Sequence, residues 1–181
     1  MPNIQANNPA DYGDPHSEVL AVTGSNVLVD RSNVGRLSFK GVDSLELINR
    51  LSTNKLEEVP IGDGVPTVLT SPKGRVVDAL LLGSQTDQLL CLTSPGQQQT
   101  ILDWIEFYTF GEDVCVQDIS ESTSHFTICG LNPESAVASL GILVNYIGPY
   151  QLQTVDFEGF PVTIWRTRRS GADSFEVISP R

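Results

Sequence analysis

The chain has 181 residues, of which 40% are hydrophobic and 18% are charged, and its formal net charge is −11. This composition is typical of a globular chain with a buried core and excludes a disordered one. The negative charge argues against a general nucleic-acid binder, because attraction to phosphates dominates such binding. No apolar run approaches the roughly 20 residues of a membrane helix, and the N-terminus lacks the apolar segment of a signal peptide. We therefore expect a cytoplasmic protein with no nucleic-acid and no membrane partner.

The basic residues are unevenly distributed. All 11 lysines and arginines lie within residues 31–75 or 166–181, and none lies between Val76 and Trp165. An anionic small molecule could therefore still meet local positive charge. The alternative is that these side chains are solvated and keep the strands soluble.

Residues 1–24 are rich in Asn, Pro and Asp, and we predict that they form a flexible N-terminal tail. The periodicity that follows predicts strands at 26–30, 35–40, 67–70, 75–82, 88–93 and 114–119. Helices are expected at 44–51 and 96–110, and a tight turn at 71–74 is favoured by its proline and glycine.

The second half of the chain repeats the first. A strand at 124–130 is followed by a helix at 132–140, then by a hairpin of 152–156 with 161–166 and by a strand at 175–178. Gly159 lies 85 residues after Gly74, and Ser179 lies 85 residues after Ser94. A constant offset indicates an internal duplication. We therefore divide the chain into a first repeat, 25–120, and a second repeat, 121–181.

The second repeat is expected to be incomplete. Ser94 and Pro95 lead into a helix that would cover one face of the sheet, whereas Ser179 and Pro180 lead only to Arg181. Uncovered apolar surface costs roughly 25 cal/mol per Å². We therefore expect a partner protein, or a missing C-terminal region of a longer protein, to cover this face.

The cysteines and histidines predict no metal site. Cys91, Cys115 and Cys129 show no Cys-x-x-Cys spacing, and each lies in a strand-like apolar context typical of a buried reduced thiol. His16 and His125 are far apart in the sequence, which does not fit a zinc site.

The stretch from residue 51 to residue 80 belongs to an ordered series of signals. A strand, Gly-x-Asp, a helix, Thr-Asn and a glycine precede the pattern Thr-x-Leu-x-x-Pro-x-Gly-x-x-x-Asp, which ends at Asp78. This series resembles the folate-binding family that includes the aminomethyltransferase (T-protein) of the glycine cleavage system and the YgfZ-type folate proteins. The resemblance implies an α+β fold, a duplicated β-α-β-β-β-α folate-binding domain, from which the last helix of the second copy and the C-terminal barrel of the relatives are absent.

The resemblance also implies the cofactor, tetrahydrofolate, and the residues that would bind it. The implied contacts are Thr67, Asp78, Thr93 and Arg166. Asp78 matches the first aspartate of the family's Asp-Asp-Leu, and is the candidate catalytic residue, because a carboxylate can orient an arylamine nitrogen and accept its proton. The alternative is that Asp78 is an ordinary polar residue of a half-buried strand.

Several family positions have changed in this chain. The second aspartate is Ala79, the tyrosine before the hairpin is Pro66, and the pterin-facing glutamate of the family is Ala172. A carboxylate normally pairs with the pterin edge, so its loss is a serious departure. Glu176 matches a later Phe-Glu pair of the family, but lies a strand away.

These departures favour the YgfZ branch. The sequence therefore predicts a tetrahydrofolate-binding protein that is accessory to iron–sulfur cluster or tRNA-modification maintenance. One alternative is a folate-dependent aminomethyl- or methyltransferase of the T-protein type. Another is an assembly module that binds no folate.

Overall fold

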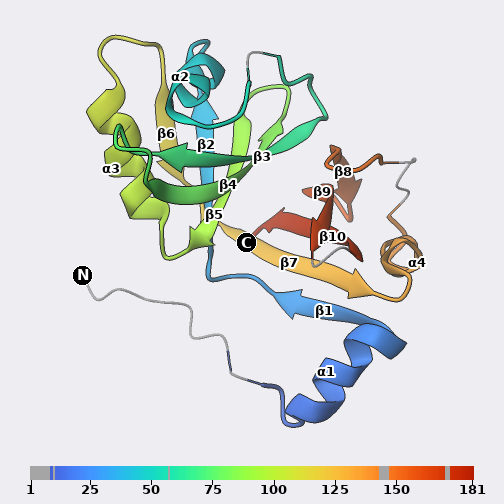
Figure 1. Cartoon of the computed structure of the whole chain (residues 1–181). Coiled ribbons are helices and arrows are strands. Elements are labelled where there is room, and N and C mark those ends of the chain that lie inside the picture. The colour runs from blue at the N-terminus through green and yellow to red at the C-terminus, as the bar shows by residue number, and fades with distance from the viewer. Residues whose placement is uncertain (1–8, 10, 57, 143–146, 170–171) are drawn as a thin grey trace. The chain divides into compact units, whose positions relative to one another are not determined.

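The computed structural model of the chain describes residues 9, 11–56, 58–142, 147–169 and 172–181. Within them the chain forms an α+β fold of two five-stranded antiparallel sheets and four helices (Figure 1). The chain divides into two compact units: unit 1 comprises Met1–Asn33 with Ser122–Arg181, and unit 2 comprises Val34–Glu121. The predicted α+β class is confirmed. Among the described residues, no helix has the length and apolar character needed to cross a bilayer.

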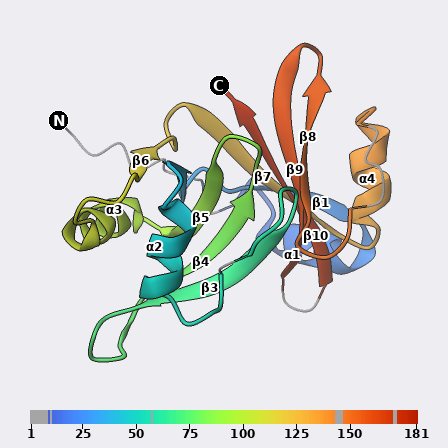
Figure 2. The ribbon, with the colours of Figure 1, turned by 90° about the horizontal axis from the view of Figure 1, so that it is seen from above.

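Unit 2 is one sheet covered on one face by two helices. Its strands are β2 (Val34–Lys40), β3 (Gly64–Thr70), β4 (Val76–Ser84), β5 (Leu89–Pro95) and β6 (Cys115–Asp118), in the order β3-β4-β5-β2-β6. The helices are α2 (Ser44–Leu51) and α3 (Gln98–Tyr108), and Figure 2 shows α2 across the strands and α3 beside β6.

Alternation along the strands of unit 2 places the core on the helix side of the sheet. Leu80 and Leu82 of β4 and Leu37 of β2 belong to one buried cluster with Ile48 of α2 and Ile101 of α3. The sheet face that bears these side chains is called the helix face of unit 2 below.

Unit 1 is also one five-stranded sheet with two helices. Its strands are β1 (Asn26–Asp30), β7 (Thr123–Gly130), β8 (Leu152–Phe157), β9 (Phe160–Arg169) and β10 (Ala172–Pro180), in the order β1-β7-β10-β9-β8. Helix α1 (Pro15–Gly24) neighbours β1 and β7, and α4 (Pro133–Ser139) neighbours β7 and β10. A second buried cluster joins Val137 of α4 to Ile128, Ile164 and Phe175 of the sheet.

The two sheets have the same strand order when strands are matched by position. Strands β7, β10, β9 and β8 correspond to β2, β5, β4 and β3, and β1 holds the edge position that β6 holds in unit 2. The turns correspond as well: Gly74 joins β3 to β4 with a φ of +70°, and Gly159 joins β8 to β9 with a φ of +87°. This order is what a duplication of one unit would produce.

The edge strand of unit 1 comes from an unexpected part of the sequence. The strand at 26–30 was assigned to the first repeat, 25–120, but β1 pairs with β7 of unit 1 in the register Asn26↔Gly130 to Asp30↔Phe126. Strand periodicity alone does not specify which sheet a strand joins. The N-terminal segment supplies unit 1 with an edge strand and a helix, the two elements that α3 and β6 supply in unit 2.

The predicted flexible tail, residues 1–24, falls partly outside the described residues, and its last ten residues form α1. Asp14 caps this helix by accepting a hydrogen bond from the Ser17 N–H at 3.2 Å, and Pro15 occupies its first turn, as is common at helix starts. None of its residues is buried. The apolar periodicity that reveals most helices is therefore absent, which explains the missed helix.

Candidate ligand site

Three of the four predicted site residues lie together on the helix face of unit 2. Thr67 pairs with Leu80 across β3 and β4, Asp78 lies two residues before Leu80, and Thr93 lies two residues after Cys91. Leu80 and Cys91 both belong to the buried core cluster. Since side chains two residues apart share a sheet face, the three polar side chains point toward the helices.

Asp78 is buried and bonded to the backbone. Its Oδ1 accepts from the Ala79 N–H at 2.8 Å and its Oδ2 from the Ser94 N–H at 2.9 Å. The pairing of β4 with β5 ends at Leu81 and Leu92, so the Ser94 N–H lies beyond it. The carboxylate supplies the acceptor that the ladder does not, which is a structural task for this side chain.

Thr67 and Thr93 differ in their contacts. Thr93 Oγ1 donates to the Ser94 carbonyl at 2.9 Å and lies over Gly35, where an added Cβ would come within 2.4 Å of it. Thr67 is buried, and its Oγ1 has no hydrogen-bond partner among the described residues. A buried hydroxyl without a partner is unusual and marks a place where a ligand or water could bind.

All three cysteines are free thiols, but only one of them is buried as expected. Cys91 is buried, whereas Cys115 is exposed and Cys129 is half-buried. Burial raises the pKa of the Cys91 thiol well above its ordinary value, and the nearby charge of Asp78 raises it further. Cys91 is therefore a protonated core residue and not a nucleophile.

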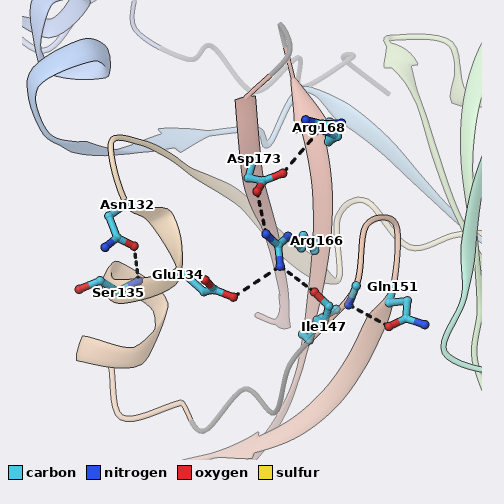
Figure 3. A network of polar contacts seen from close by, with 9 residues as sticks. Asn132, Glu134, Ser135, Ile147, Gln151, Arg166, Arg168 and Asp173 are labelled. Atoms are coloured by element: carbon cyan, nitrogen blue, oxygen red, sulfur yellow. Dashed lines mark hydrogen bonds and ion pairs between the residues drawn. The ribbon is translucent and has the colours of Figure 1, made fainter.

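Arg166, the fourth predicted residue, lies in unit 1 at the centre of a polar network (Figure 3). Its guanidinium donates to Asp173 Oδ2 at 2.7 Å and to the Ile147 carbonyl at 3.0 Å, and lies 3.4 Å from Glu134 Oε1. It also stands over the Phe175 ring at 5.9 Å. These contacts join β9 and β10 to the start of α4, so Arg166 fixes the α4 side of the sheet.

The opposite face of the same sheet holds a buried polar cluster that the sequence analysis did not identify. Glu176 of β10 has no exposed surface; its Oε2 lies 2.9 Å from His125 Nε2 and accepts from Thr127 Oγ1 at 2.5 Å, and its Oε1 accepts from Thr167 Oγ1 at 3.0 Å. Ser174 adds a contact to Thr167 at 2.9 Å. A buried carboxylate requires such partners, because burial without them is costly.

Arg166 and Glu176 are therefore not part of one cluster. Arg166 pairs with Phe175, which belongs to the core beneath α4, and the next residue, Glu176, points to the other face. One signal for the Glu176 cluster was present in the sequence, since His125 and Thr127 alternate along β7, as do Ser174 and Glu176 along β10. Their meeting depends on the β7–β10 register, which pairs residues about 50 positions apart.

The face of unit 2 opposite the helices carries the two positions at which the chain departs from the resembling pattern. Pro66 and Ala79 are both exposed, and Val68, which shares the face of Pro66, pairs with Ala79. Neither side chain offers a polar group. The tyrosine and the second aspartate that the resemblance implies would both have stood on this face.

Residues 3–181 match the family described as the GCVT N-terminal domain. The chain belongs to this family. A relative is the aminomethyltransferase of Thermotoga neapolitana, 26% identical over 94% of this chain and 47% of its own length. Another is the sarcosine oxidase subunit alpha of a Corynebacterium species, 26% identical over 91% of this chain and 18% of its own length. The chain thus spans about half, or less, of the length of these relatives.

The fold agrees with that of a solved relative. The glycine cleavage system aminomethyltransferase T of Bartonella henselae superimposes with a TM-score of 0.80 at 19% identity, over 91% of this chain and 44% of that one. For this GCVT N-terminal domain, the expected family is therefore confirmed, as is its α+β architecture.

Proposed function

We propose that this GCVT N-terminal domain binds tetrahydrofolate. The observation that carries the proposal is the family match over residues 3–181, together with relatives that are named as aminomethyltransferases. Because the chain spans 47% of the length of such a relative, the proposal concerns binding by this portion. When bound, tetrahydrofolate would carry a one-carbon unit on one of its ring or arylamine nitrogens.

The chain has buried side chains of the chemical type that such a ligand needs. A pterin edge presents N–H groups, which pair best with a carboxylate. Asp78 and Glu176 are the buried carboxylates of the described residues, and Ala172 offers none. We assign the pterin contact to Glu176: its partners Thr127 and Thr167 are neutral hydroxyls that can be exchanged for ligand N–H donors, while His125 would keep its contact with Oε2.

The other predicted contacts enter the proposal unchanged. Asp78 stays the candidate proton acceptor, and Thr67, Thr93 and Arg166 stay candidate contacts. The partnerless Thr67 hydroxyl supports a polar ligand atom near β3. The backbone bonds of Asp78 support a second role, in which it positions the Ser94 turn and acts on the ligand only through it.

We propose that the protein is an accessory factor and not a catalyst. Its role would lie in iron–sulfur cluster or tRNA-modification maintenance, as in the YgfZ branch. The support is the exposed face of β3 and β4, where Pro66 and Ala79 replace the two polar residues implied by the resemblance. The second candidate, a folate-dependent aminomethyltransferase, is favoured by the similarity to the aminomethyltransferase of Thermotoga neapolitana.

Calorimetric titration with 5-formyltetrahydrofolate tests the binding proposal. We expect saturable heat with one ligand per chain and a dissociation constant in the micromolar range. A titration without heat at high micromolar ligand would reject both the accessory and the aminomethyltransferase candidates and leave the non-folate assembly module.

A further inference from the structure

Unit 2 exposes an aromatic surface at the C-terminal end of α3 that the proposed ligand site does not use. Phe107 is 68% exposed and Phe110 is 81% exposed. Val42, which is 86% exposed, stands in the neighbouring turn. Large apolar side chains that are this exposed on neighbouring segments are typical of interaction sites.

Hydrogen bonds hold the two segments of this surface side by side. The Val42 N–H points to Asp113 Oδ2 at 3.4 Å, and the Asp113 N–H donates to Asp43 Oδ2 at 2.8 Å. The Phe110 N–H donates to Glu112 Oε2 at 2.6 Å. The turn at 41–43 and the loop at 110–113 thus form one fixed surface with the end of α3, which we call the α3 surface.

The rim of the α3 surface is acidic. Its carboxylates belong to Asp43, Asp103, Glu106, Glu112 and Asp113. The bases nearby are Lys40 and Arg50, and Arg50 binds Glu112 at 2.5 Å. The Arg50 hydrogen bond lowers the pKa of Glu112 to about 2, so this rim carboxylate stays ionised near neutral pH. The whole segment from Val76 to Glu121 contains no lysine or arginine.

This charge decides what could cover the aromatic side chains. Two copies of the surface would bring like charges together, and phosphates of nucleic acids or anionic lipids would be repelled in the same way. A basic protein segment would be attracted to the rim, and an apolar side chain on it would cover Phe107 and Phe110.

We propose that the α3 surface docks a partner protein through a segment with an apolar anchor flanked by lysines or arginines. The inference rests on unit 2 alone and does not depend on folate binding. Exposed aromatic anchors supply the affinity, and the acidic rim supplies the selection against acidic partners.

The test uses the full chain and a labelled synthetic peptide with a central tryptophan flanked by lysines, measured by fluorescence anisotropy. A peptide of the same length with glutamates in place of the lysines serves as the charge control. The variant is Phe107→Ser with Phe110→Ser. The matched control is Phe160→Ser with Val76→Ser, which removes two apolar side chains of 60% and 68% exposure elsewhere.

We expect the lysine peptide to bind the wild-type chain and the control variant alike, and its affinity to fall with added salt. The double phenylalanine variant should bind about tenfold more weakly or worse, with an unchanged unfolding transition. No binding, equal binding of the glutamate peptide, or equal binding by the phenylalanine variant would overturn the proposal. So would self-association in sedimentation that is lost only in the phenylalanine variant, which would make a second copy the occupant.

Discussion

Replacing Gly41 by alanine is expected to lower the free energy of unfolding by about 3 kcal/mol. Gly41 has a φ of +106°, and an added Cβ would stand 2.0 Å from the carbonyl oxygen of Asp113. That carbonyl cannot move aside easily, because it accepts from the Asp43 N–H while the Asp113 N–H binds Asp43 Oδ2. The substitution therefore combines backbone strain with a backbone collision.

Gly74→Ala is the matched control for this prediction. Gly74 also has a positive φ, +70°, but an added Cβ would meet nothing within 4 Å. Only the strain remains, so the loss should be about 1 kcal/mol. Urea unfolding of both variants measures the difference. Equal losses would show that Asp113 does not pack on Gly41 as described.

The same argument extends to Gly130 in unit 1. Its φ is +127°, and an added Cβ would stand 2.2 Å from the Ser25 carbonyl. Gly41 directly follows β2 beside the segment that enters β6, and Gly130 ends β7 beside the segment that enters β1. If the two units are related by duplication, Gly130→Ala should lower the free energy of unfolding by as much as Gly41→Ala.

Changing Asp78 to asparagine is expected to destabilise the chain by about 2 kcal/mol. The carboxylate accepts two backbone N–H groups, and asparagine has only one oxygen to offer them. Its NH₂ group would face the second N–H as a donor against a donor, so one buried group would lose its partner. Thermal or urea unfolding measures the loss.

Asp87→Asn provides the control, since Asp87 is an exposed loop aspartate and its change should be close to neutral. Folate affinity and one-carbon transfer of the Asp78 variant then separate its roles. Transfer abolished with affinity within a few fold would support a catalytic Asp78. Unchanged stability would refute the positioning role drawn from its backbone bonds.

Much of the fold could be predicted because its elements carry local signals. The helix predicted at 44–51 coincides with α2, and the glycines that mark the two hairpins, Gly74 and Gly159, occupy equivalent turns. Long-range pairing carries no such signal, so the pairing of β1 with β7 could not be predicted from the sequence. Helix α1 was missed because it buries no apolar face.

The candidate site was predicted less completely for the same reason. The motif around Asp78 identifies a strand. It does not show which face of the sheet the carboxylate lies on, or that the carboxylate accepts a hydrogen bond from the Ser94 N–H. In the sequence, Glu176 was recognised only as a match to the family's Phe-Glu pair. Its contacts with His125 and Thr127 depend on a register between distant strands, which no local periodicity encodes.

The most direct test of folate binding by this chain compares the calorimetric titration of Glu176→Gln with that of the wild-type chain, using 5-formyltetrahydrofolate. Glu46→Gln, on the exposed side of α2 and away from every proposed ligand contact, is the control. We expect the wild-type chain and the control to bind alike and the Glu176 variant to bind about a hundredfold more weakly while it remains folded. Binding by a folded Glu176→Gln variant with wild-type affinity would contradict the assignment of the pterin contact, and absence of binding by the wild-type chain would contradict the function itself.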